Sequence, residues 1–521
     1  MRTLYLIILY VGILANIRVK AQCTTGSFGD PVTGSESFGS GSNPGAKLST
    51  EQSNLVYKTN CNLNDTEYTI LNSVIGCHTE GWHNVLQDHT PDDVNGYMMV
   101  INATDQSSIS GTFYYKKIDD LCPNTTYSFS AYVLDLIRKD VDGPNARHPN
   151  LTFSIETTSG AILGQSVTGL LESTVTPEFH QYPKPENPLC FTTGNTTTEI
   201  ILKITNNAPG GNGNDLILDD ITFRAMGPPT TAEFSDPSGP PDSPRNICIG
   251  NSIIYQLNGN VDDPDYQNYQ WQVNANNTGW VDISTTDNTT ATSKILSLVV
   301  NAPPVGKYQY RLAVAKAGQM ASVNCRIYST PLTINVNPLP VINVDPEIEF
   351  CEGETVTVTA SGGARHEWNG PGLPPNSPAL NIPNATPANS GTYTVRAVSS
   401  FGCKSLYAAP VKVTVHPKVN ATINAINPIC EGGSVQLSAS GGSIYKWTPA
   451  TGLDHDDIPN PTATPAVTTT YSVTVTEGIC SEVKPITVTV YKNPKANTPG
   501  DKEIFEDESV LLDAHPEGDN V

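Results

Sequence analysis

The sequence predicts an all-β fold, in which an N-terminal jelly-roll β-sandwich is followed by tandem immunoglobulin-like β-sandwich modules. Turn formers are abundant, because 41 of the 521 residues are glycine and another 41 are proline. Apolar and polar residues alternate with a period of two in segments such as Tyr471–Thr476, as they do in half-buried strands. A segment that begins at Cys351 is repeated almost without gaps from Cys430 onwards. Repeats of short alternating strands separated by turns are typical of tandem sandwich modules.

Residues 1–21 have the features of a secretory signal peptide. Arg2 gives a positive start, and an apolar run of 12 residues extends from Leu4 to Ala15. Val19 and Ala21 supply short side chains for a cleavage site. The apolar run is shorter than the roughly 20 residues of a membrane span. We therefore expect a secreted or cell-surface protein that holds disulfides among its 11 cysteines.

Residues 22–228 contain no copy of the repeat and are predicted to form the jelly roll. About eight strand candidates alternate with turns rich in glycine, proline and asparagine, a pattern that fits a two-sheet sandwich. They are Glu67–Leu71, Trp82–Leu86, Gly96–Asn102, Thr112–Lys117, Thr126–Ile137, Asn150–Thr157, Glu199–Thr205 and Asp215–Phe223.

Three modules follow, at residues 229–337, 338–416 and 417–491. Each has the order Cys…Trp…Cys, which is typical of immunoglobulin-like sandwiches. The tryptophans predicted to fill the space between the two sheets of each module are Trp271, Trp368 and Trp447. By repeat position, the cysteines are predicted to pair within modules, as Cys248–Cys325, Cys351–Cys403 and Cys430–Cys480. The pairing stays open for Cys23, Cys61, Cys77, Cys122 and Cys190.

Residues 492–521 are predicted to begin a fourth module. The segment Phe505–Ala514 matches Cys430–Ala439, with phenylalanine in place of the first cysteine. The sequence therefore predicts a truncated module at this end, and a half-module cannot bury its own apolar face.

The composition excludes some classes of partner. The chain has 29 basic and 51 acidic residues and a net charge of −22, whereas a nucleic-acid binder presents a basic face. The same charge disfavours docking on anionic lipid. We expect no nucleic-acid partner and no insertion into a membrane.

The repeat resembles a known group of surface proteins. The run Cys430-Glu-Gly-Gly-Ser-Val, together with Trp447-Thr-Pro-Ala-Thr-Gly-Leu, is similar to the Ig-like and PKD-like repeats of large cell-surface proteins of Bacteroidetes. Such proteins often carry a gliding-motility-associated, type IX secretion domain at the C-terminus. The resemblance implies surface display and adhesion.

The N-terminal region resembles carbohydrate-binding modules of the galactose-binding-like class. Its closing segment, residues 210–223, is similar to the last strand of that class, and Gly26–Asp30 is similar to the first. In that class a structural Ca²⁺ is held by an acid of each strand, which implies Asp30 and Asp220, with Asp219 as a substitute. The class has glutamate at the position of Asp30, and the glutamate side chain reaches further than that of aspartate. Alternatively, Asp219 and Asp220 bind no metal and are simply charged, solvent-exposed residues at the end of a strand. No cofactor is otherwise required.

Sugar binding needs aromatic faces that stack on pyranose rings and polar groups that fix hydroxyls. The candidate aromatics are Trp82, Tyr97, Tyr114, Tyr115, Tyr132 and Tyr182. The alternative is that most of these rings belong to the core.

No catalytic motif is found, so we expect that the chain is not an enzyme. The sequence lacks H-E-x-x-H, G-x-S-x-G and Walker motifs. The segment from Cys77 to Thr90 contains His78, His83 and His89, which could hold zinc. Hydrogen-bonded loop histidines are the favoured interpretation.

These observations predict a non-catalytic, secreted or cell-surface adhesion protein. The jelly roll would recognise a carbohydrate or an extracellular protein, and the modules would form a stalk. A first alternative is the targeting and spacer part of a polysaccharide-degrading enzyme whose catalytic domain lies beyond the fragment. A second alternative is a structural adhesin that binds protein.

Overall fold

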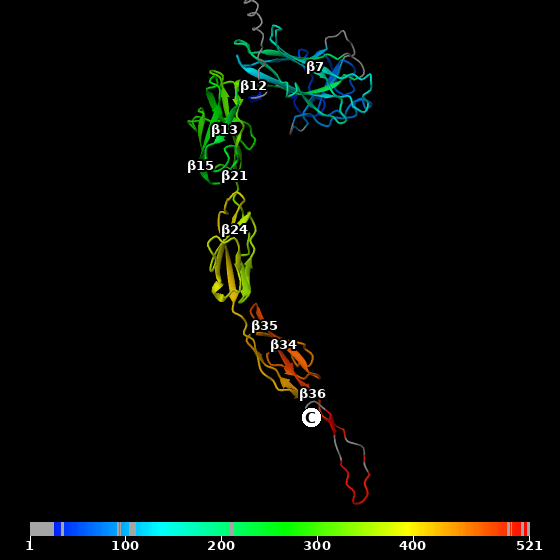
Figure 1. Cartoon of the computed structure of the whole chain (residues 1–521), viewed down its shortest axis with the longest axis vertical. Coiled ribbons are helices and arrows are strands. Elements are labelled where there is room, and N and C mark those ends of the chain that lie inside the picture. The colour runs from blue at the N-terminus through cyan, green and yellow to red at the C-terminus, as the bar shows by residue number, and fades with distance from the viewer. Residues whose placement is uncertain are drawn as a thin grey trace, which may run out of the picture. The chain divides into compact units, whose positions relative to one another are not determined.

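The computed structural model describes residues 26–32, 36–90, 93, 95–103, 111–208, 213–286, 288–497, 501, 503–511 and 515–517. The predicted signal peptide and Cys23 lie outside these residues. The described chain consists mainly of strands and loops (Figure 1). It also contains two short 3₁₀ segments, η1 (Val323–Cys325) and η2 (Pro387–Asn389). The all-β prediction is confirmed.

The chain forms two compact units. The first contains Met1–Asn246 and Gly250–Val336, and the second contains Ile247–Ile249 and Asn337–Val521. The first unit therefore holds the N-terminal sandwich and most of module 1 (residues 229–337). The second holds module 2 (338–416), module 3 (417–491) and the C-terminal segment.

The N-terminal sandwich has two sheets. The larger runs in the order β10 (Leu189–Thr192), β6 (Thr126–Asp135), β12 (Leu216–Gly227), β4 (Met98–Asn102), β3 (Glu67–Leu71) and β2 (Val56–Tyr57), with β1 (Ser27–Pro31) beside β12 and β9 (His180–Tyr182) beside β6. The smaller runs in the order β5 (Thr112–Ile118), β11 (Ile200–Asn206), β7 (Asn150–Glu156) and β8 (Ile162–Leu170).

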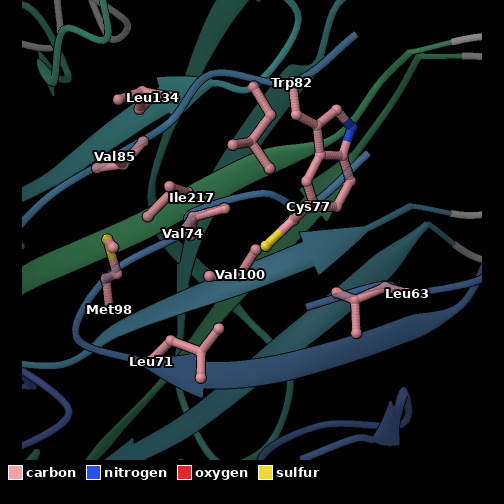
Figure 2. Close-up of a cluster of buried hydrophobic side chains, with 11 residues drawn as sticks. Leu63, Leu71, Val74, Cys77, Trp82, Val85, Met98, Val100, Leu134 and Ile217 are labelled. Carbon is pink, nitrogen blue, oxygen red and sulfur yellow. The ribbon is translucent and has the colours of Figure 1, made fainter. Parts of the chain in front are cut away.

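The core of this sandwich follows from the alternation of side chains along each strand. Phe129 of β6 and Phe223 of β12 point inward with ring centroids 5.1 Å apart, and Phe129 meets Phe153 of β7 at the same distance. A second cluster packs Trp82 and Cys77 against residues of β4, β6 and β12 (Figure 2). The inward phenylalanines require that their sequence neighbours on β6 and β12 point to the opposite face of the larger sheet.

Module 1 pairs a three-stranded sheet with a six-stranded one. The first has the order β13 (Thr230–Phe234), β15 (Ser252–Val261) and β18 (Ile295–Asn301). The second has the order β14 (Arg245–Cys248), β21 (Leu332–Asn337), β19 (Gly306–Ala315), β16 (Asn268–Ala275) and β17 (Val281–Asp282), with β20 (Ile327–Tyr328) beside β19.

Module 2 has a four-stranded and a two-stranded sheet. They are β22 (Glu347–Cys351), β27 (Ala409–His416), β26 (Gly391–Val398) and β24 (Arg365–Asn369), and β23 (Val356–Val358) with β25 (Leu380–Ile382). The first strand, β22, runs parallel to the last strand, β27, so that Cys351 lies beside His416.

Module 3 repeats this plan in shorter pieces. Its main sheet is β32 (Ile444–Thr448), β34 (Thr469–Glu477) and β35 (Cys480–Val488). Short pairs complete it: β28 (Thr422–Ile423) with β31 (Ala439–Ser440), β29 (Ile429–Cys430) with β36 (Val490–Tyr491), and β30 (Val435–Gln436) with β33 (Thr462–Ala463). In the C-terminal segment, β37 (Lys495–Asn497) pairs with β38 (His515–Glu517).

Each module buries its tryptophan. Trp271, Trp368 and Trp447 expose 0%, 2% and 1% of their surface. The indole nitrogens of Trp271 and Trp447 donate to backbone oxygens at 2.9 and 3.0 Å. Because the indole N–H would otherwise be buried without a partner, these bonds let a large ring fill the core at little polar cost.

The predicted pairing of cysteines within modules is wrong. The disulfides are Cys61–Cys77, Cys122–Cys325, Cys248–Cys403 and Cys351–Cys480. Cys190 is also disulfide-bonded, whereas Cys430 is an exposed free thiol. In two of these bonds, Cys248–Cys403 and Cys351–Cys480, a cysteine near the start of one module is bonded to the second cysteine of the next.

The geometry of the final strand explains this correction. In module 2, Cys351 lies beside His416 at the end of β27, while Cys403 precedes the start of that strand at Ala409. An eight-residue strand is roughly 25 Å long. A disulfide needs Cα atoms within about 7 Å, so the two cysteines of one module cannot meet.

Candidate functional site

A groove of about 630 Å³ lies on the outer face of the larger sheet of the N-terminal sandwich. Ser128, Ser130 and Tyr132 line it from β6, between the core residues of that strand. Thr222 and Arg224 line it from β12, where they pair directly with Ser130 and Ser128. Because alternate residues share a face, two strands that are apolar inside present a polar surface outside.

A β-bulge in β12 sets the position of two acidic side chains. The register with β6 shifts between Asp219 and Thr222, and Asp220 has a positive φ of 44°. The extra residue of a bulge changes the direction of neighbouring side chains. As a result, Asp219 is fully buried whereas Asp220 lines the groove.

His89 and Thr90 also line the groove, from a loop. Asp220 bonds to His89 Nδ1 and to the Thr90 hydroxyl, both at 2.8 Å. The ring of His89 stacks on Tyr132 with centroids 3.4 Å apart and planes 17° apart. The hydroxyl of Tyr132 donates to Gln181 Oε1 at 3.3 Å. The groove wall is thus fixed by hydrogen bonds and ring stacking.

An exposed aromatic ring also lines the groove. Phe28 of β1 lines the groove and exposes 40% of its surface. Arg224, which is also exposed, forms no ion pair with any residue that the structure describes. The groove therefore combines an apolar ring, a row of hydroxyls and a guanidinium group.

A group of carboxyls lies behind the groove. Burial is the main cause that raises the pKa of Asp219 to about 8, and the nearby charges of Asp220 and Asp88 act in the same direction. Hydrogen bonds from the backbone N–H groups of His89 and Asp220, at 2.9 and 2.8 Å, oppose this rise. Burial also raises the pKa of Asp88, whose Oδ2 has no hydrogen-bond partner among the residues that the structure describes.

The acids implied for calcium are held by different partners. Asp30 forms two bonds with the guanidinium of Arg311, at 2.8 and 2.5 Å, while Asp220 is bonded to His89 and Thr90. Within the described ranges, no group of three or more His, Cys, Asp or Glu side chains is arranged to hold a metal. The structure therefore does not join Asp30, Asp219 and Asp220 into one ligand set.

The contact of Asp30 belongs to the junction between the N-terminal sandwich and module 1. The Arg311 guanidinium carbon lies 4.1 Å from the ring centroid of Trp280 and 3.5 Å from that of Tyr328. The disulfide Cys122–Cys325 bonds the same two parts of the first unit. Cation–π contacts and an ion pair together hold the arginine in one place.

Most of the aromatics predicted from the sequence lie in the core. Trp82, Tyr97, Tyr114 and Tyr182 are buried, and Tyr115 is half-buried on β5 of the smaller sheet. Of the six, Tyr132 lines the groove, and its face is covered by His89. Phe28 and Arg224 were not predicted as site residues, and His89 was named only as a possible zinc ligand, although Phe28 belongs to the segment that resembles the first strand of a carbohydrate-binding module.

The segment from Cys77 to Thr90 does not gather into a zinc site. Cys77 is bonded to Cys61 and so offers no thiolate. His83 is buried, and burial lowers its pKa. His89 lies in the groove. Trp82 donates from Nε1 to Asp215 at 3.0 Å, and burial raises the pKa of Asp215 to about 7.

Comparisons with known proteins give distant fold likenesses. No protein-family model and no curated protein matches the sequence. Extracellular domains 3–5 of Drosophila OTK share 13% identity, covering 47% of this chain and 94% of that one, with a TM-score of 0.20. The fibronectin(III)-like modules of Clostridium thermocellum CbhA share 14% identity, covering 36% and 95%, with a TM-score of 0.21. Immunoglobulin domains 1–4 of Sidekick-1 share 14% identity, covering 56% and 82%, with a TM-score of 0.19.

These likenesses are too weak to assign a family. The sandwich fold rests instead on the strand pairings and buried tryptophans of this chain. In the part of the chain that the structure describes, no helix has the length and apolar character needed to cross a membrane.

Proposed function

We propose that this chain is a non-catalytic, extracellular recognition protein whose groove binds carbohydrate and whose modules form a stalk. The observation that carries the proposal is the groove itself, which places an exposed phenylalanine beside hydroxyl, carboxylate and guanidinium groups. Its volume of about 630 Å³ lies in the usual range for small-ligand sites. The disulfides support an oxidising, extracytoplasmic location.

Saccharides fit the chemistry of this groove. A sugar ring has an apolar face that can stack on Phe28 and hydroxyls that both donate and accept hydrogen bonds. Arg224 can only donate, Asp220 in its ionised form can only accept, and Ser128 can do both. A ligand with many hydroxyls can satisfy all three at once.

Binding to a glycan array tests the proposal directly. We expect the secreted chain to bind a defined set of glycans, and we expect Phe28→Ala and Arg224→Ala each to weaken binding by about tenfold. Ile162→Ala is the matched control, because Ile162 is an exposed apolar residue on the smaller sheet. Equal loss in the control, or no binding to any glycan, would refute carbohydrate recognition.

Protein binding and catalysis are the competing outcomes. Capture of an extracellular protein that depends on Phe28, without any glycan binding, would identify a protein-binding adhesin. Release of reducing sugar from a polysaccharide by the purified chain would show an enzyme and overturn the proposal.

A further inference from the structure

The first cysteines of the three modules occupy the same backbone position. In each module, the residue after this cysteine donates its backbone N–H to the carbonyl of the residue that ends the last strand. The three bonds are Ile249 to Asn337 at 2.9 Å, Glu352 to His416 at 2.8 Å and Glu431 to Tyr491 at 2.8 Å. Cys248, Cys351 and Cys430 are thus structural equivalents at the end of their modules where the last strand finishes.

Two of these three cysteines are bonded to the second cysteine of the following module. Cys248 is bonded to Cys403 with Cα atoms 5.5 Å apart, and Cys351 is bonded to Cys480 with Cα atoms 5.7 Å apart. Both distances lie at the usual value for a disulfide. The second cysteine of module 1, Cys325, is likewise bonded to the part of the chain that precedes its module, at Cys122 of the N-terminal sandwich.

The third equivalent, Cys430, is an exposed free thiol among the described residues. Its position at the end of β29, beside Tyr491, is the position that Cys351 has beside His416. After residue 491 the sequence repeats the opening of a module at Phe505–Ala514. The bonds of the two equivalent cysteines, Cys248 and Cys351, therefore indicate which kind of cysteine would pair with Cys430.

We propose that Cys430 forms a disulfide with the second cysteine of an immunoglobulin-like module that stands next in series after residue 491. The argument rests on the two equivalent bonds rather than on the exposure of the thiol. The partner is defined by its place, which is the place of Cys403 in module 2 and of Cys480 in module 3.

The bond forms by thiol–disulfide exchange. The Cys430 thiolate attacks the disulfide of a protein oxidoreductase, which gives a mixed disulfide and releases one oxidoreductase thiol. The thiolate of the partner cysteine then displaces the second oxidoreductase sulfur. The two cysteines lose two electrons and two protons in total, and the oxidoreductase is reduced to its dithiol.

Non-reducing peptide mapping of the protein purified from its natural source tests this bond. Free thiols are alkylated at lysis, so that exchange cannot occur during digestion. We expect the peptide that contains Cys430 to be linked to a peptide that carries a second-position cysteine. The Cys248–Cys403 and Cys351–Cys480 peptides report in the same digest that native pairing was preserved. An alkylated Cys430, or its linkage to any other cysteine, overturns the proposal.

A designed extension supplies the partner directly. A copy of residues 417–491, with its own first cysteine replaced by serine, is appended after Tyr491 of the secreted chain, and its second cysteine is either kept or replaced by serine. We expect alkylation of Cys430 to be lost when the cysteine is kept and to persist with serine. Persistent alkylation in both, with Cys351–Cys480 intact and the appended copy protected from protease, contradicts the proposal.

Discussion

Replacing Asp219 with asparagine tests whether its buried carboxyl is protonated in the folded chain. Asp219 is 0% exposed, and burial raises its pKa from 3.8 to about 8. A raised pKa means that the folded state binds the proton more tightly than the unfolded state. The stabilisation is therefore complete below about pH 4 and is lost as the pH rises towards 8.

The size of this effect follows from the shift in pKa. A shift of about four units corresponds to at most about 6 kcal/mol between acid solution and pH values above about 8, of which about 4 kcal/mol is lost by pH 7. Asp219→Asn removes this dependence, because the amide does not ionise. Asparagine keeps one acceptor oxygen and turns an NH2 group, which cannot accept, towards the other of the two backbone N–H donors, at a cost of about 1–3 kcal/mol. The slope with pH is therefore a better measure than stability at a single pH.

Hydrogen exchange can measure how the local stability of the strands around Asp219 changes with pH. Local opening free energies of β6 and β12 should fall between pH 5 and about pH 8 in the wild type and fall less steeply in Asp219→Asn. Asp215 and Asp135, whose pKa values burial raises to about 7 and about 6, leave a residual slope of the same sign. Asp119→Asn, at an exposed position, should behave as the wild type. An unchanged slope in Asp219→Asn would show that Asp219 is ionised in the fold and refute this reasoning.

Three further predictions concern the junctions and the acidic side chains. Arg311→Ala should destabilise the first unit by about 2 kcal/mol in thermal unfolding, because it removes the contacts with Trp280 and Tyr328 as well as the ion pair with Asp30. Asp30→Asn should lower the stability by less, because Asp30 is half-exposed and the variant removes only the ion pair. Calcium and EDTA should leave the melting temperature within about 1 °C, since Asp30 is already paired; a larger rise with calcium would contradict this. Proteolysis between modules 2 and 3 should give fragments that stay linked in the absence of reductant in the wild type but separate in Cys351→Ser. Separation of the fragments in both proteins would contradict the observed Cys351–Cys480 bond.

Strands with clear alternation could be predicted from the sequence. Glu67–Leu71 is predicted and found with the same bounds, because its pattern depends on neighbours within the strand. The edge strand β8 was missed, since its residues from Ile162 to Leu170 are mostly exposed and include two glycines. The strand predicted at Trp82–Leu86 is a loop whose tryptophan packs into the core, and no local pattern indicates that packing.

The candidate site was only partly predictable for a different reason. Asp220 was identified through the resemblance to carbohydrate-binding modules, and Tyr132 was identified because an aromatic ring can serve as a platform for a sugar. His89 reaches Asp220 across 131 residues of sequence, and a bulge decides which of two adjacent acids faces the groove. Neither the distant contact nor the bulge leaves a signal in the order of residues.

The pairing of cysteines shows how a correct repeat can lead to a wrong contact. Repeat position establishes that Cys351 and Cys430 are equivalent, but equivalence does not specify which cysteine lies nearby. The parallel pairing of the first and last strands carries Cys351 to the end of module 2 where Cys480 of module 3 can reach it.

The observed pairing gives each junction two covalent connections, the peptide linker and a disulfide. A disulfide within a module would mainly constrain the unfolded chain of that module, whose core is already filled by a buried tryptophan. A disulfide between consecutive modules instead keeps the chain whole after a cut in the linker. Because exposed linkers are the preferred sites of proteolysis, this arrangement keeps consecutive modules joined after a cut at those points. In this arrangement the first cysteine of a module is bonded across the junction to the following module. The free thiol of Cys430 is therefore the group that would bond to a module after module 3.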